Sequence, residues 1–130
     1  LIAPGTIWDT TYKQRVALLV DEIVIQTYNT GFDSPTDYTQ WIAYQVESYT
    51  AAIAALDVDV NLFVGIPTYD ADPPRFNPAV ENIASAAAGL RDGVSAAGDA
   101  ARFLRGAALY AEWTTDDREW EAFRAEWAVR

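Results

Sequence analysis

The chain has 130 residues, of which 51% are apolar and 13% aromatic; this excludes general intrinsic disorder and allows one domain with one modest core. Its net charge of −10 argues against nucleic acid as a partner, because phosphate binding requires a basic patch. The absence of Cys and His excludes thiol nucleophiles, disulfides, zinc fingers and His-based triads, and no apolar run is long enough to span a membrane.

The beginning of the chain has no signal-peptide pattern. Residues 1–5 lack both a basic region and an apolar run of sufficient length, and the first residue is Leu1 rather than Met. We therefore expect a segment of a longer protein. The composition fits a cytosolic protein and a disulfide-free exported one equally well.

Short apolar runs alternate with longer helical stretches along the chain, which predicts βα units and a parallel sheet. The first helix is predicted over residues 10–20, with Asp9 as its N-cap. The first strand, residues 22–28, is almost continuously apolar, as is typical of a strand buried on both faces. The second helix begins at Pro35, after the N-cap Ser34.

The second half of the chain repeats this alternation. A strand is predicted over residues 60–68, and the third helix is expected to follow the N-cap Asn77 and to end near Gly93. Residues 94–104 indicate a short further helix or an irregular turn. The third strand is predicted over residues 106–112, and a final helix follows it.

Three parallel strands with helices between them fit either a barrel or a doubly wound sheet. The barrel is favoured, because no strand is followed by a Gly-rich phosphate loop and because aromatic and polar residues gather just after the strands' carboxyl ends. We therefore predict an α/β fold in which residues 1–130 form the last three βα units of a (β/α)₈ TIM barrel. A complete barrel of this type needs about 250 residues.

Three motifs resemble the sixth, seventh and eighth strands of glycoside hydrolase barrels, particularly the chitinase-like (family 18) group and its non-catalytic relatives. Residues 21–29 (DEIVIQTYN) resemble the sixth-strand pattern, in which an aspartate opens the strand and Met-x-Tyr-Asp closes it; Gln26 and Asn29 replace the Met and the Asp. Residues 62–69 (LFVGIPTY) are similar to the Gly-x-Pro-x-Tyr seventh strand, and residues 106–113 (GAALYAEW) to the eighth.

The resemblance carries expectations about activity. The family's catalytic acid motif lies on the fourth strand, so the principal acid would lie outside this segment. No cofactor is implied. The cellular compartment stays open, although export would fit, because polymer-degrading barrels are usually exported.

Two candidate ligand contacts lie on the first strand. Side chains alternate along a strand, so Val24, Gln26 and Tyr28 share one face, and a Gln in an apolar strand is costly unless it has partners. If this face lines a barrel, Gln26 and Tyr28 would hydrogen-bond a sugar. The alternative is that Gln26 satisfies polar neighbours and Tyr28 fills the core. Tyr69, which leaves the second strand, would line a pocket or cover the rim.

The end of the third strand holds the candidate catalytic carboxylate. Glu112 follows an apolar strand and is interpreted as an acid, a base or a ligand for hydroxyls, working with a partner on another strand. Trp113 is interpreted as a stacking platform for a pyranose. The alternatives are a Glu paired with an Arg and a Trp packed under the final helix. Asp70 and Asp72 are interpreted as solvated turn residues, so no metal site is predicted.

Three functions therefore compete. The first is part of a glycoside-hydrolase-like barrel that acts on a polysaccharide or amino-sugar polymer, with the remaining N-terminal half of the barrel as its structural partner. The second is a non-catalytic barrel that binds glycan or cell wall. The third is a structural αβ half-barrel module, because three strands alone leave two sheet edges exposed.

Overall fold

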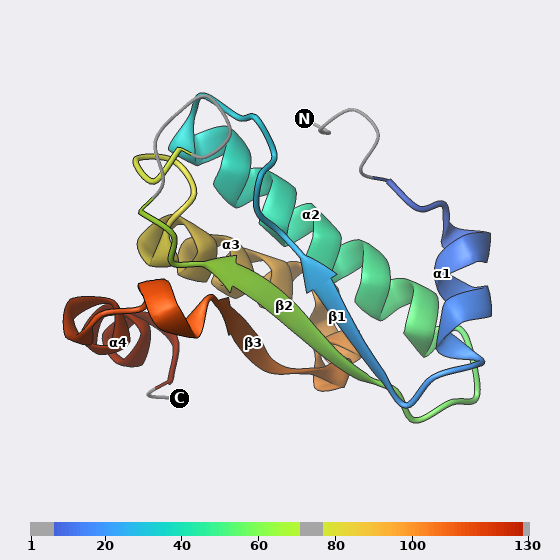
Figure 1. Cartoon of the computed structure of the whole chain (residues 1–130). Coiled ribbons are helices and arrows are strands. Elements are labelled where there is room, and N and C mark those ends of the chain that lie inside the picture. The colour runs from blue at the N-terminus through green and yellow to red at the C-terminus, as the bar shows by residue number, and fades with distance from the viewer. Residues whose placement is uncertain (1–6, 71–76, 129–130) are drawn as a thin grey trace.

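The computed structural model describes residues 7–70 and 77–128. Helices and strands alternate through this part of the chain (Figure 1). In order they are α1 (Thr10–Ala17), β1 (Glu22–Gln26), α2 (Pro35–Ala54), β2 (Asn61–Pro67), α3 (Ile83–Ala97), β3 (Leu104–Tyr110) and α4 (Asp117–Phe123). Two 3-10 helices, η1 (Gly98–Phe103) and η2 (Glu112–Thr114), flank β3, and a π-helical turn (Arg124–Ala128) follows α4.

The three strands form one open, parallel sheet in the order β1-β2-β3. Gly65 of β2 lies opposite Gln26 of β1 and Ala108 of β3, which sets the register across the sheet. An α/β fold with three parallel strands and four helices is thereby confirmed for the described residues. Each strand lies within two residues of its predicted bounds, a shift expected where strand ends fray.

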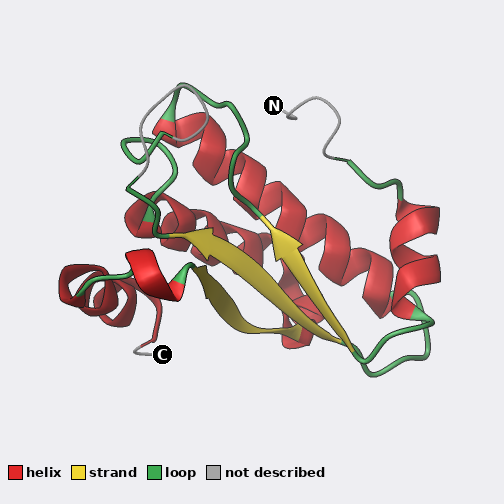
Figure 2. Ribbon diagram, in the orientation of Figure 1, coloured by secondary structure: helices red, strands yellow, loops and turns green. Residues whose placement is uncertain are grey.

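The helices cover only one face of this sheet (Figure 2). Ile23 and Ile25 of β1 are buried on that face, as are Leu62, Val64 and Ile66 of β2. Along β1, exposed and buried residues alternate, so the expectation of a strand buried on both faces does not hold for this strand. The sheet therefore has a covered face, packed on the helices, and an open face.

Local capping explains where the first helices begin. The Asp9 carboxylate accepts a hydrogen bond from the Tyr12 amide at 2.7 Å, and the Ser34 hydroxyl accepts one from the Asp37 amide at 3.3 Å. Both predicted N-caps are confirmed. The cap of α3 is Asn82 rather than Asn77; residues 77–82 form a separate turn before the helix.

Two glycines allow α2 and α3 to approach each other closely. A Cβ atom on Gly89 would lie 2.6 Å from the Thr39 carbonyl oxygen, and one on Gly93 would lie 2.6 Å from the Val46 Cβ. Gly93 is therefore a packing residue within α3, and its predicted role as a helix end is wrong. The helix ends at Gly98, whose φ of 55° suits a residue without a side chain.

The described residues contain no helix that is both long enough and apolar enough to cross a membrane.

Candidate functional site

Four aromatic rings follow one another across the carboxyl ends of the three strands; we call Tyr69, Tyr28, Tyr110 and Trp113 the aromatic strip. Tyr69 meets Tyr28 edge-on, with ring centroids 6.4 Å apart. Tyr28 and Tyr110 stack at 4.8 Å with an interplanar angle of 8°. Tyr110 and Trp113 meet edge-on at 5.9 Å. Ring pairs at these separations stabilise one another, so the strip is a connected unit.

Gly65 makes the central stack possible. It lies on the central strand β2, between β1, which Tyr28 follows, and β3, which ends at Tyr110. A Cβ atom on Gly65 would lie 3.2 Å from Cε1 of Tyr28 and 3.1 Å from the Ile25 carbonyl oxygen. A larger residue would therefore push the Tyr28 ring away from Tyr110.

The strip changes from buried to exposed along its length. Tyr69 is 7% exposed, whereas Tyr110 is 44% and Trp113 79% exposed. Burial, with a smaller contribution from Tyr110, raises the pKa of the Tyr28 phenol. The exposed end, Tyr110 and Trp113, therefore presents aromatic surface to solvent.

A buried carboxylate fixes the other end of the strip. Glu81 is 3% exposed and accepts hydrogen bonds from the backbone amides of Asn29 at 2.8 Å and Thr30 at 2.7 Å. The hydroxyls of Thr30 and Tyr69 also donate to it. Glu81 therefore joins the loop after β1 to the residue that follows β2 by two positions.

These bonds also explain the state of Tyr69. Burial, and the hydrogen bond to Glu81, raise the pKa of the Tyr69 phenol, so its hydroxyl keeps its proton and can donate. The same oxygen accepts a 3.3 Å hydrogen bond from the Asn29 amide. Asn29 itself has φ 57°, a left-handed conformation that Asn tolerates better than most residues. Tyr69 thus helps to hold the rim of the site.

A threonine cluster positions the turn that carries Trp113. Thr68, at the end of β2, lies 2.7 Å from the hydroxyl of Thr115 and donates to the Ala111 carbonyl oxygen at 3.2 Å. The Thr114 hydroxyl accepts from the Ala111 amide at 3.2 Å. The peptide bond between Tyr110 and Ala111 is cis. The turn after β3 is therefore bonded to the end of β2.

The predicted site residues occupy different places. Tyr28, Tyr69 and Trp113 come together in the aromatic strip. Gln26 is exposed and lies along a groove at the outer edge of β1. Glu112 is exposed in η2, next to Trp113 in the chain. The assignment of each of these residues to a sugar site stays a prediction.

Two members of the site escaped the sequence analysis. Tyr110 shares its strand face with Gly106 and Ala108, and this alternation could have identified it. Nothing in the local sequence singles out Glu81, because the backbone amides that it binds are 51 and 52 residues away and Tyr69 is 12 residues away. It precedes the cap of α3 and resembles an ordinary surface carboxylate.

The described residues include no group of three or more His, Cys, Asp and Glu side chains arranged to hold a metal ion. Asp72, one of the two acidic turn residues discussed above, lies outside the described residues. The chemistry that the described site offers is therefore stacking and hydrogen bonding, with Glu112 as an exposed carboxylate beside the strip.

Three comparisons with known proteins complete the description. No family model, curated protein or solved structure matches the chain. Any functional proposal therefore rests on the residues and the geometry described above.

Proposed function

We propose that this chain forms part of a carbohydrate-active, glycoside-hydrolase-like barrel that acts on a polysaccharide or amino-sugar polymer. The observation that carries the proposal is the aromatic strip, whose exposed end lies at the carboxyl ends of parallel strands. Active sites of TIM barrels are built at this edge. The apolar face of a pyranose ring packs well on an aromatic face, and hydroxyl groups beside it supply hydrogen bonds.

The open face of the sheet supports the barrel over a doubly wound sheet. A doubly wound sheet has helices on both faces, whereas here they lie on one. The middle of the open face holds three small residues, Gly65, Gly106 and Ala108, over which side chains such as Tyr28 and Phe63 pack. We infer that this face is part of a barrel interior, which the remaining N-terminal half would close.

Catalysis would require residues beyond this segment. Glycoside hydrolysis uses two carboxyl groups, or one carboxyl with the substrate's own acetamido group. Glu112 supplies one exposed carboxylate, and no hydrogen bond joins it to another acidic residue in the described part of the chain. In this proposal Glu112 assists from the eighth strand, Gln26, Tyr28, Tyr69 and Trp113 contribute to sugar binding, and the main acid lies elsewhere.

A non-catalytic glycan-binding or cell-wall-binding barrel is the second candidate. The observation that favours it is that no pair of carboxylates accompanies the aromatic strip among the described residues. Stacking on the rings alone suffices for binding a sugar. The change of the sixth-strand Asp to Asn29 fits this reading, because it removes a carboxylate from the carboxyl end of β1. A purely structural half-barrel module would bind no glycan.

A binding titration tests the shared core of these proposals. The folded chain is titrated with chitohexaose and, separately, with cellohexaose, and binding is followed by tryptophan fluorescence and calorimetry. We expect Trp113→Ala to weaken binding about three- to tenfold, because one stacking contact is lost. Trp120→Ala is the matched control, since this 42% exposed ring lies on α4 and has no ring contact with the strip.

The outcomes separate the candidates. Binding of chitohexaose alone indicates an amino-sugar ligand, and binding of both indicates a broader polysaccharide site. A folded chain that binds neither, or one whose affinity falls equally with Trp113→Ala and Trp120→Ala, contradicts the aromatic strip as a sugar site.

A further inference from the structure

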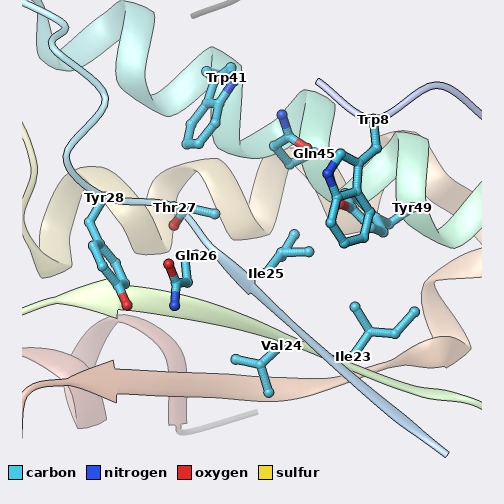
Figure 3. Close-up of a pocket in the computed structure, with 10 residues that line it drawn as sticks. All are labelled: Trp8, Ile23, Val24, Ile25, Gln26, Thr27, Tyr28, Trp41, Gln45 and Tyr49. Atoms are coloured by element: carbon cyan, nitrogen blue, oxygen red, sulfur yellow. The ribbon is translucent and has the colours of Figure 1, made fainter. Parts of the chain in front are cut away.

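A groove of about 370 Å³ runs along the outer edge of β1, between this strand and α2 (Figure 3). Its strand side is formed by Ile23 and Ile25, and its helix side by Trp41, Gln45 and Tyr49. Trp8, just before α1, lies over one part of it beside Tyr49, with ring centroids 6.3 Å apart. The groove therefore follows the whole outer edge of β1, and Val24, Gln26 and Tyr28 line it beside the residues of the covered layer.

Two buried hydrogen-bond donors in this groove have no partner among the described residues. They are Nε1 of Trp41 and Nε2 of Gln45, in side chains that are 3% and 4% exposed. A buried donor without an acceptor is costly, and native proteins rarely leave one unpaired. Both nitrogen atoms are shielded from solvent and so lie behind the surface of the groove; they show that the wall formed by α2 is not fully hydrogen-bonded among the described residues.

The backbone of β1 offers further donors at the same place. The Thr27 amide donates to the Gly65 carbonyl at 3.3 Å, and the Asp21 carbonyl accepts from the Asn61 amide at 3.0 Å. In a parallel ladder, the backbone amides and carbonyls of alternate residues bond to the same neighbouring strand, so those of the residues in between point to the opposite edge. The amides of Val24 and Gln26 therefore point to the outer edge of β1, where no described strand pairs.

The position of α1 indicates which strand would fill the groove. The sheet advances from β1 to β3 with the crossover helices α2 and α3 on one face, and α1 packs on α2 on that same face. Crossovers between parallel strands share one hand. A strand that precedes α1 must therefore lie on the side of β1 away from β2, directly in the groove.

We propose that this groove is the acceptor site for one further β-strand, which precedes α1 on a longer form of the polypeptide and runs parallel to β1. Its backbone would pair with Val24 and Gln26, and its helix-facing side chains would pack against Trp41 and Gln45. A second copy of the chain is disfavoured as the occupant, because two copies would each carry a net charge of −10. The inference locates the barrel partner proposed above and does not depend on glycan binding.

An added strand tests the inference on the full chain. A second copy of residues 61–66 is joined ahead of Leu1 through a flexible Gly/Ser linker, and amide hydrogen exchange is measured with and without it. Exchange at Val24 and Gln26 is expected to slow about tenfold or more in a protein that stays monomeric by light scattering.

Val24→Pro in the extended protein is the matched control. It removes an edge donor and no β1–β2 bond, so the sheet should form while the gain in protection at Gln26 is lost. If both amides exchange equally fast with and without the extension, the proposal is overturned. Slow exchange at both in an unextended dimer would also overturn it, because a second copy would then be the occupant. Glycan titration of the same samples separates this result from failure of the proposed function.

Discussion

The covered and open faces of the sheet differ in the kind of side chain they carry. On the covered face, Leu62, Val64 and Ile66 are completely buried against the helices. On the open face, Gly65, Gly106 and Ala108 are small, the ring of Phe63 lies beside Gly106, and the aromatic strip lies at the carboxyl ends. Contacts within the chain therefore explain the covered face. The open face is explained only near its rim, where Glu81 and the aromatic strip bond to one another.

The largest expected effect comes from the rim, where the contribution of Glu81 to the free energy of unfolding can be compared with that of residues on the covered face. Glu81→Ala should lower the free energy of unfolding by about 3 kcal/mol, because it leaves the part-buried backbone amides of Asn29 and Thr30 and the hydroxyl of Tyr69 without their acceptor. Urea unfolding measures the change. Glu47→Ala, an exposed carboxylate on α2, is the control and should alter stability by no more than about 0.5 kcal/mol.

The result also bears on the aromatic strip. If Glu81→Ala were as mild as Glu47→Ala, the loop after β1 would not depend on this carboxylate. Tyr69 would then need another explanation for its orientation toward Tyr28.

A second prediction compares one residue type on the two faces. Val64 is completely buried on β2, whereas Val24 on β1 is 49% exposed on the open face. Val64→Ala should cost about 2 kcal/mol, since it removes two buried carbon atoms and leaves a small cavity. Val24→Ala should cost less than about 0.5 kcal/mol in the chain alone. Equal costs, measured by the same urea titration, would mean that the open face is covered in solution.

The covered elements were largely predictable from sequence, because their signals are local. A cap such as Ser34 satisfies an amide three residues away, and an apolar run such as that of β2 identifies a buried strand by itself. Gly93 shows the limit of local reasoning. A glycine inside a helical pattern suggests a helix end, and only the contact with Val46 shows that it permits close helix packing.

The site was less predictable, because its contacts join distant segments. Tyr28 and Tyr69 were identified from their positions at strand ends, but the stacking of Tyr28 on Tyr110 depends on the strand register and on Gly65. Glu81 is defined by partners on the loop after β1, more than fifty residues earlier. Neither feature has a signature within a short window of sequence.

The smallest expected effect concerns a phenol of the covered side. Burial raises the pKa of Tyr49, which is 7% exposed on α2, to about 12 from an ordinary value of 10.0. Because the pKa of Tyr49 is higher in the folded than in the unfolded state, its contribution to the stability of the fold is complete below pH 10. This contribution is lost as the pH rises toward 12. When the pH is raised from about 9 to about 11, the free energy of unfolding of Tyr49→Phe should therefore fall by about 1 kcal/mol less than that of the parent chain.

Urea unfolding at the two pH values measures this difference, with Tyr44→Phe, at an exposed ring on the same helix, as the control. The parent should still lose stability through Tyr38 and Tyr69, whose pKa values burial also raises. Lys13 acts in the opposite direction, because burial lowers its pKa and its contribution to stability grows as the pH rises. If the loss is the same in the parent and in Tyr49→Phe, the Tyr49 hydroxyl must reach water, and the layer between α2 and Trp8 is then more open than the covered face beneath the strands.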